Sequence, residues 1–356
     1  MTDVSTNVTQ TPHREPPYPS KSPELLGLGD GLNFSTPLAQ ISGTIVPNPL
    51  FFLRSNNQPP VIAPGEWRMR LDGRVERPLT LGLEDLQALP VRRQEVWLEC
   101  AGNSRIRFDP PGEGNQWDDQ AVSNAEFKGV SLSAVLDEVR LLDDAIEVVA
   151  TGADAANFQR SLPLDIARHP EILLAWEMNG EPIPPPNGGP VRMIVPAWAG
   201  IASVKWPIRL EVVNAPFGGY YHSERYIIVD AEGRTVRSVR EMPVKSLIAQ
   251  PADGQTLGAG PHVISGFAWS GLGQIDQVEV STDDQHTWLP ARLIHGEGPF
   301  AWTRWESQWT PARPGRTTIA SRATDSAGNV QPAQAAWNKF GYLMNAIVTR
   351  TVNIRA

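Results

Sequence analysis

The residue best suited to chemistry is the single cysteine, Cys100, in the segment VWLECAGNSRIRF. It ends an apolar run that predicts a strand, and Gly102 and Asn103 follow at once, as in a tight turn. Arg105 and Arg107 bring two cations close in sequence, and nearby cations favour the thiolate form of a cysteine. Three hypotheses stay open for this thiol: a nucleophile, a ligand for a soft metal, and a buried structural residue.

The cysteine and histidine content narrows these hypotheses. One cysteine excludes an internal disulfide, a Cys-rich zinc site, an iron–sulfur cluster and a C-x-x-C-H haem attachment. The six histidines form no H-x-x-x-H pair, which disfavours ordinary zinc hydrolysis. A cysteine hydrolase would need a histidine base, and His222 is the candidate for that role.

A second candidate site lies between residues 175 and 213. The run PPPNGG (184–189) predicts a constrained loop with exposed backbone amides, and Arg192 and Lys205 bracket a short apolar strand. Backbone amides and fixed cations suit an anion such as a phosphate. The alternative is a surface loop that happens to carry two cations.

Length and charge exclude several classes of protein. The 356 residues predict two domains, and 31 Lys and Arg against 39 Asp and Glu give a net charge of −8. An acidic chain lacks the basic surface of a nucleic-acid binder, and no run of 18 apolar residues predicts a membrane span. The N-terminus has no secretory signal pattern, so we expect a cytoplasmic protein, or a periplasmic one if a leader was removed.

The elements that must position these residues follow a mixed pattern up to residue 235. Residues 1–43 predict an extended N-terminal arm. Beyond it, Trp67–Val75 resembles a hairpin around an Asp-Gly turn, Leu83–Ala88 a helix, and Ser131–Val139 a helix with Ser131 as N-cap. Further strands are expected at Val96–Cys100, Ile146–Thr151, Ile172–Glu177, Val191–Val195 and Val204–Val213. Without regular βαβα alternation, an α+β fold is favoured over a doubly wound sheet.

The pattern changes after a connecting stretch at 214–242. From Pro243 short alternating strands recur every 8–12 residues or so, which is typical of an immunoglobulin-like β-sandwich. Six of the 12 tryptophans fall in this stretch. They fill either the sandwich core or an interface.

Several blocks of sequence together resemble the sulfite oxidase family of molybdenum enzymes. These are CAGN with Arg105, EMNGEP followed by PVR and VKW, NPLFFLRSNN, PVKSLIAQPADG, GFAWSG, VEVSTDDQHTW and WNKFGYLMNA, in one order over about residues 44–352. The resemblance implies a molybdopterin-binding domain of mixed α+β fold at 44–235 and an immunoglobulin-like dimerisation domain at 236–356.

The resemblance also implies a site. Cys100 would ligate molybdenum, and Arg54, Arg105 and Tyr226 would line the substrate pocket. Molybdopterin would be held by residues matched by position: Phe52, Arg54, Asn56, Asp154, Asn187, Arg192, Ser203 and Lys205. Family members often carry His where Asn56 and Asn187 stand, and Asn can donate a hydrogen bond there but adds no charge.

The implied reaction is oxidation of sulfite or a similar small anionic sulfur substrate. The resemblance implies a homodimer without haem in this chain, so the electrons would pass to a separate acceptor such as a cytochrome. Two departures open the question of substrate: Ser104 and Phe340 stand where animal and plant members carry Arg. A sulfane dehydrogenase-like or other oxyanion or S-oxide enzyme is therefore an alternative. A non-catalytic binding protein that uses its β-sandwich is the non-enzyme alternative.

Overall fold

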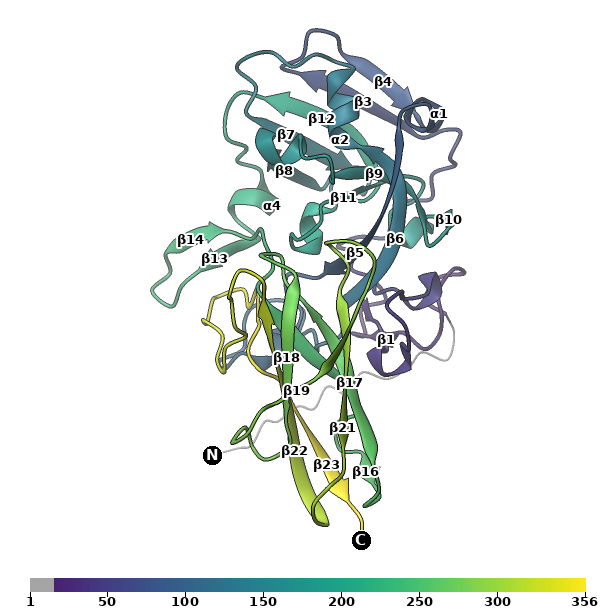
Figure 1. Cartoon of the computed structure of the whole chain (residues 1–356). Coiled ribbons are helices and arrows are strands. Elements are labelled where there is room, and N and C mark those ends of the chain that lie inside the picture. The colour runs from purple at the N-terminus through teal and green to yellow at the C-terminus, as the bar shows by residue number, and fades with distance from the viewer. Residues whose placement is uncertain (1–15) are drawn as a thin grey trace.

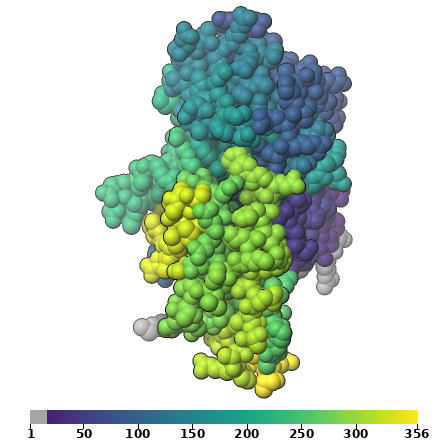
Figure 2. Space-filling model, viewed as in Figure 1, coloured from purple at the N-terminus to yellow at the C-terminus, as the bar shows by residue number. Residues whose placement is uncertain are grey.

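A computed structural model describes residues 16–356, and these form two lobes stacked end to end (Figure 1). The N-terminal lobe contains the strands from β3 to β12, and the C-terminal lobe those from β15 to β23. Figure 2 shows the two lobes in broad contact, with the purple N-terminal segment against their junction. No helix in the described part of the chain is long and apolar enough to cross a membrane.

The first sheet of the N-terminal lobe ends at the cysteine. Its order is β10-β9-β6-β5, with β11 also paired to β9. The bounds are β5 Val91–Glu99, β6 Val122–Ser131, β9 Leu173–Met178, β10 Glu181–Pro182 and β11 Arg192–Ile194. β5 and β6 pair along their whole length, from Val91 opposite Val130 to Glu99 opposite Val122, so Cys100 leaves the sheet from a fixed end.

The second sheet has the order β4-β3-β12-β7-β8. Its strands are β3 Arg68–Gly73, β4 Leu79–Gly82, β7 Glu147–Gly152, β8 Gln159–Pro163 and β12 Pro207–Val213. Only β12 and β3 pair in parallel, and the other pairs are antiparallel. The two sheets enclose an apolar core that includes Trp67, Leu136 and Leu210.

Helices are short, so the chain is mostly β. They are α1 Leu83–Gln87, α2 Leu132–Asp137, α3 Leu164–Ala167 and α4 Tyr220–Ser223, with 3-10 turns η1 Leu38–Gln40, η2 Asn48–Leu50, η3 Arg105–Arg107, η4 Pro185–Asn187 and η5 Gly200–Ala202. The α+β prediction holds in this loose sense. Two helix predictions are confirmed, and the Ser131 hydroxyl accepts from the Ala134 N–H as the N-cap rule requires.

The hairpin predicted within Trp67–Val75 is wrong. Asp72 and Gly73 lie inside β3, opposite Glu211 and Val212 of β12. The chain turns later, and β3 pairs with β4 instead. Parallel pairing with β12, which is distant in sequence, thus extends β3 through Asp72-Gly73, although Asp-Gly usually marks a turn.

The C-terminal lobe consists of two sheets, β15-β17-β21-β20 and β16-β23-β22-β18-β19. Their strands are β15 Lys245–Gln250, β16 Thr256–Leu257, β17 His262–Trp269, β18 Ile275–Ser281, β19 Leu289–Pro290, β20 Arg292–His295, β21 Thr303–Trp309, β22 Gly315–Asp325 and β23 Thr349–Ile354. Apolar side chains of both sheets, including Ile264, Val278 and Trp305, form one core.

The segments outside these sheets connect the lobes. The stretch 214–242 holds α4 and a hairpin of β13 (Ile227–Val229) and β14 (Thr235–Ser238), which projects to the left in Figure 1. The arm carries β1 (Leu26–Gly27) and β2 (Phe34–Ser35) and buries Leu25 and Phe34. The described part of the arm is therefore packed against the protein, while residues 1–15 lie outside the described range.

The tryptophans of the C-terminal lobe occupy both of the expected environments, the core of that lobe and its interface with the N-terminal lobe. Trp305 is fully buried in the core of the C-terminal lobe. Trp269 and Trp302 are also fully buried but belong to the apolar cluster shared by both lobes, where Trp269 packs on Trp97 with ring centres 6.3 Å apart. The lobes therefore share a continuous apolar core, which fixes the position of one against the other.

Candidate active site

One cavity gathers most of the predicted site. It has about 760 Å³ of atom-free space, its open mouth included. Its walls include the predicted residues Phe52, Arg54, Asn56, Cys100, Asp154, Arg192, Ser203, Lys205 and Tyr226. Arg105 and Asn187 do not line it; both are buried beside residues that do. We call this space the Cys100 cavity.

Cys100 is held at the end of β5 by its backbone. Its N–H donates to the Ala121 carbonyl at 2.9 Å, and its own carbonyl accepts from the Asn103 N–H. The side chain is 7% exposed. Burial raises the pKa of the Cys100 thiol, and the charges of Arg54 and Arg105 oppose that rise. A thiol next to two guanidiniums is a ready ligand for a soft metal, which would itself favour the thiolate.

Arg105 lies in a channel of glycines. A Cβ atom on Gly102 would overlap its guanidinium, and one on Gly341 would come 2.6 Å from its Cγ. Its Nε donates to the Phe340 carbonyl at 2.8 Å and a terminal nitrogen to the Asn115 carbonyl at 2.6 Å. The guanidinium has two carbonyl partners and no carboxylate partner in the described residues, so no anion of the chain neutralises it beside Cys100.

Arg54, like Arg105, is a guanidinium without a carboxylate partner in the described residues. One of its terminal nitrogens donates to Asn33 Oδ1 at 3.2 Å and the other to Asn56 Oδ1 at 2.6 Å. No described residue forms an ion pair with it. Asn56 therefore orients an arginine of the cavity, a contact that its sequence position did not predict. Asp154 accepts from the Phe158 N–H at 2.7 Å and from Asn57 Nδ2 at 3.2 Å.

Lys205 and Arg192 form the cationic end of the cavity. Lys205 Nζ donates to the carbonyls of Arg54 and Pro186 and to Ser55 Oγ, at 2.8–3.1 Å. Arg192 is 5% exposed and donates to the Asn187 carbonyl at 2.9 Å. Burial lowers the pKa of Lys205 well below its usual range and that of Arg192 to about 10. A buried and a half-buried cation, neither with a carboxylate partner in the described residues, call for an anion.

Two buried donors in this region have no partner in the described residues. They are Asn187 Nδ2 and Arg192 Nε. Buried N–H groups are almost always paired, so an orphaned pair marks a place where an acceptor belongs. Gly188 follows Asn187 with a left-handed backbone (φ +114°), and a Cβ atom on it would lie 3.1 Å from Lys205 Cβ. The loop is therefore tight as well as donor-rich.

Tyr226 and its neighbours form an aromatic wall. The Tyr226 ring stacks on Tyr342 with centres 5.1 Å apart, and the guanidinium of Arg105 lies 5.1 Å from the Tyr342 ring centre. Tyr226 has φ +49°, a left-handed backbone that costs a non-glycine residue free energy and is common at functional sites. The Arg225 guanidinium lies 4.6 Å from the Phe340 ring centre, and the sequence analysis did not single out Arg225.

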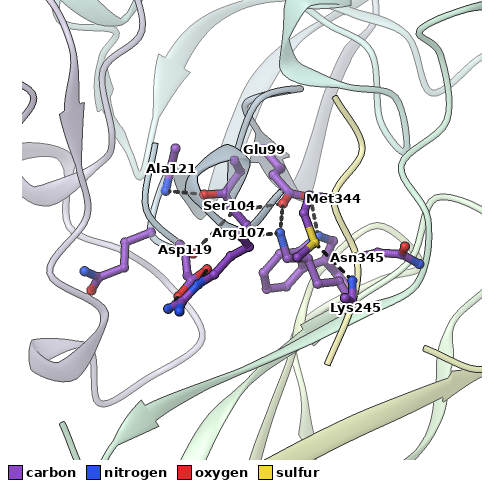
Figure 3. A network of polar contacts seen from close by, with 12 residues as sticks. Glu99, Ser104, Arg107, Asp119, Ala121, Lys245, Met344 and Asn345 are labelled. Atoms are coloured by element: carbon purple, nitrogen blue, oxygen red, sulfur yellow. Dashed lines mark hydrogen bonds and ion pairs between the residues drawn. The ribbon is translucent and has the colours of Figure 1, made fainter. Parts of the chain in front are cut away.

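A buried polar network crosses from the C-terminal lobe to the Cys100 loop (Figure 3). Lys245 Nζ lies 3.0 Å from Glu99 Oε1 and donates to Ser104 Oγ at 2.8 Å. Trp269 Nε1 donates to the second Glu99 oxygen at 2.7 Å, and Asn103 Nδ2 to the first at 2.8 Å. The loop that carries Cys100 is thus held on one side by the other lobe, which no local motif in the sequence indicated.

His222 does not support the cysteine hydrolase hypothesis. It is not among the residues that line the Cys100 cavity, and its Nδ1 lies 3.4 Å from Ser161 Oγ. Burial lowers the pKa of His222 to about 4. Within residues 16–356 no group of three or more His, Cys, Asp and Glu is placed to hold a metal, so Cys100 has no such cluster around it.

Comparison with known proteins decides the family. Residues 56–221 match the model of the oxidoreductase molybdopterin binding domain, and residues 236–354 that of the Mo-co oxidoreductase dimerisation domain. The chain is 35% identical to the sulfite oxidase of Gallus gallus over 85% of its own length and 72% of the relative's. It belongs to the sulfite oxidase family of molybdopterin oxidoreductases. Its cofactor is molybdenum held by molybdopterin.

Other members of the sulfite oxidase family are similar over different lengths. The mitochondrial sulfite oxidase of Rattus norvegicus is 35% identical over 85% of this chain, which spans only 60% of that relative. The solved structure of the sulfane dehydrogenase SoxCD from Paracoccus pantotrophus superposes with a TM-score of 0.84, at 31% identity, over 91% of this chain and 87% of that one.

The described residues fit molybdopterin. An orphaned pair of buried donors, two unpaired cations and a tight glycine loop suit a phosphate group, and a thiol between guanidiniums suits the metal. The cavity is lined by polar and aromatic side chains of the kinds that hold a fused heterocycle.

Proposed function

We propose that this chain is an oxidoreductase that oxidises sulfite or a similar small anionic sulfur substrate by oxo transfer and passes the electrons to a separate acceptor. The observation that carries this proposal is the buried Cys100 thiol, which faces a cavity beside two guanidiniums that have no carboxylate partner. When bound, the cofactor supplies the oxygen transfer and takes up two electrons.

The chain's own residues bind and orient. Cys100 is the proposed metal ligand, and Arg192, Lys205, Asn187 and Ser203 the proposed phosphate-end contacts. The orphaned N–H groups of Asn187 and Arg192 would find acceptors there. The Ser203 hydroxyl already accepts from the Val195 N–H at 3.0 Å, so its own O–H is free to donate.

Further contacts are proposed for the rest of the cofactor. Phe52 offers a ring at the cavity wall, while Asn56 and Asp154 offer polar groups there. Asn56 would act by holding Arg54 through the 2.6 Å hydrogen bond rather than by adding charge itself.

Arg54 and Arg105 would attract and orient the anion. The overall charge of −8 repels a dianion, so fixed guanidiniums at the site are needed to reverse the local potential. Tyr226 would donate its phenolic O–H to an oxygen of the substrate. These groups are preorganised by the glycine channel and by the Tyr226–Tyr342 stack, so little reorganisation accompanies binding.

A sulfane substrate is the second candidate. Phe340 stands where animal and plant members carry Arg, so the chain offers one cation fewer to the oxygens of sulfite at that position. The likeness to a sulfane dehydrogenase over most of both chains supports the same alternative.

The assembly belongs to the proposal as well. We propose an arm at 1–43, a cofactor domain at 44–235 and an immunoglobulin-like domain at 236–356 that forms a homodimer. The match to a dimerisation model over residues 236–354 supports the dimer. Light scattering should give about twice the monomer mass of 39.0 kDa. A mass near 39.0 kDa at working concentration would reject the dimer.

Metal and pterin analysis tests the function directly. Purified protein should contain about one molybdenum and one pterin per chain and reduce an artificial acceptor with sulfite. Rates with thiosulfate and with a neutral sulfoxide as the reverse-direction probe then separate the sulfite, sulfane and S-oxide hypotheses. Protein with neither molybdenum nor pterin would reject the enzyme and leave a binding protein.

A further inference from the structure

Lys21 extends from the N-terminal arm to the phosphate end of the proposed site. Its side chain is buried, and Nζ donates to the carbonyls of Asn48 and Phe51 at 2.6 and 2.8 Å. The third donor of the ammonium is directed to Asn187 Oδ1 at 3.2 Å. An ammonium has three N–H donors, so all of them are used.

The contact with Lys21 fixes the orientation of the Asn187 amide. Because Oδ1 accepts from a cation, the opposite end of the amide must present its N–H donors. That nitrogen, Nδ2, is buried and unpartnered in the described residues. Arg192, whose Nε is also unpartnered, donates to the backbone carbonyl of the same Asn187. Lys21 therefore sets which atom of Asn187 is left for a ligand.

The charge around Asn187 is incomplete without an anion. Lys21 and Arg192 are buried and Lys205 is half-buried, and none of the three forms an ion pair within residues 16–356. Burial and then the charge of Arg192 lower the pKa of Lys21 well below its usual range. Buried cations that repel one another cost stability, and a multiply charged phosphate offsets that cost.

We propose that Lys21 is a positioning residue for the terminal phosphate of molybdopterin, acting through Asn187, so that the N-terminal arm completes the cofactor site. Asn187 itself carries no charge; the ammonium behind it supplies one. This inference rests on the phosphate-end contacts of the proposed function and is independent of the sulfur substrate. A purely structural Lys21 would only bind the carbonyls of Asn48 and Phe51 at the two ends of η2.

The test compares cofactor retention with the stability of the cofactor-free chain. Holoprotein and apoprotein, the latter from cells unable to make molybdopterin, are prepared for wild type, Lys21→Gln, Lys21→Arg, Asn187→Ala and the double variant Lys21→Gln/Asn187→Ala. Pterin retained over time is measured by fluorescence after oxidation, and Tm is measured for both forms. Lys128→Gln, which breaks a half-buried ion pair with Glu177 between β6 and β9 of the first sheet, is the matched control.

The expected result is a loss specific to the holoprotein. Lys21→Gln and Asn187→Ala each shorten the half-life of pterin on the protein at least tenfold and shrink the holo-minus-apo difference in Tm. The double variant is no worse than either single one, because the two residues act in series. Lys21→Arg retains pterin, and Lys128→Gln leaves the half-life unchanged.

The opposing results are equally distinct. Equal losses of Tm in apo and holo Lys21→Gln, with the pterin half-life unchanged, would make Lys21 structural and overturn the inference while the function stands. Wild-type protein without pterin would overturn the function with it. If Lys21→Gln does not fold, Asn187→Ala with wild-type apo Tm and unchanged pterin retention rejects the proposal by itself.

Discussion

Lys245 Nζ lies 3.0 Å from Glu99 Oε1, and this buried ion pair joins the C-terminal lobe to the residue immediately before Cys100. Both side chains are essentially inaccessible, at 1% and 0% exposure. Ser104, Trp269 and Asn103 complete the hydrogen bonds of the pair. The lobe matched to a dimerisation model therefore also supports the loop of the proposed metal ligand.

Replacing Lys245 with methionine should destabilise the protein severely. The change leaves the Glu99 carboxylate buried without its cation, which typically costs about 3–5 kcal/mol. Urea unfolding of wild type and variant measures the loss. Arg168→Met is the control, because its exposed pair with Asp137 is worth about 1 kcal/mol or less. Equal stabilities of the Lys245 variant and wild type would contradict the role of the pair.

Cys100→Ser should abolish turnover and preserve the fold. A hydroxyl is close to a thiol in size but is a poor ligand for a soft metal. Sulfite-dependent reduction of an artificial acceptor should fall by at least about a thousandfold. Circular dichroism and Tm should stay close to wild type. Activity retained in this variant would remove Cys100 from the site.

Gly102→Ala should act on Arg105 alone. The backbone at 102 accepts a side chain, but its Cβ would overlap the Arg105 guanidinium. Because that guanidinium is held by two carbonyls, it must leave its position beside Cys100. The value of kcat/KM for sulfite should fall about tenfold or more, a loss of about 1.4 kcal/mol. Gly258→Ala, where no atom lies within 4 Å of the new Cβ, should change nothing.

Arg225→Gln should weaken the binding of anions. The Arg225 guanidinium stacks on Phe340 and has no carboxylate partner in the described chain. Its loss should raise KM for sulfite several-fold at low salt with little change in kcat, and the difference should shrink at high salt. Arg237→Gln, on the exposed hairpin strand β14, is the control. A KM that depends on salt equally in wild type and the Arg225 variant would contradict this.

Asp119→Asn should make the free energy of unfolding depend less on pH in the acid range. Burial alone would raise the pKa of Asp119, but Arg107 and Arg350 outweigh it and hold that pKa well below its usual range. A lowered carboxyl pKa stabilises the fold above the unfolded value of about 4, and this stability is lost as pH falls below it. The difference in unfolding free energy between wild type and variant should thus be large at pH 7 and smaller at pH 3. An equal difference in unfolding free energy at pH 7 and pH 3 would contradict the stabilisation of the Asp119 carboxylate by Arg107 and Arg350.

Regular local patterns made much of the fold predictable. Apolar strands such as the one expected at Ile146–Thr151, observed as β7 Glu147–Gly152, and the capped helix after Ser131 lie close to where the sequence indicates them. The sequence pattern did not predict the strand Val122–Ser131, because buried polar residues interrupt its alternation of apolar and polar side chains. Asn124 is one of these, and it is satisfied by the distant Glu95 and Thr44.

The site divides in the same way. Cys100, Arg192 and Lys205 stand in motifs that can be recognised in the linear chain, and the structure brings all three to one cavity. Lys21 and Lys245 act across 166 and 146 residues of sequence. Lys21 stands in no quoted motif, and the PVKSLIAQPADG block that contains Lys245 does not predict its contact with Glu99. Such contacts depend on how the lobes and the arm pack, and periodicity and composition carry no information about that packing.

The Lys245–Glu99 pair also sets an order for biosynthesis. The ribosome makes the Cys100 loop long before it makes Lys245, and it makes Arg350 about a hundred residues later still. A nascent N-terminal lobe therefore holds Glu99 before its partner Lys245 exists, whereas Asp119 already has Arg107 and gains Arg350 later. The loop that carries Cys100 therefore gains its buried ion pair only after β15, which holds Lys245, has been synthesised.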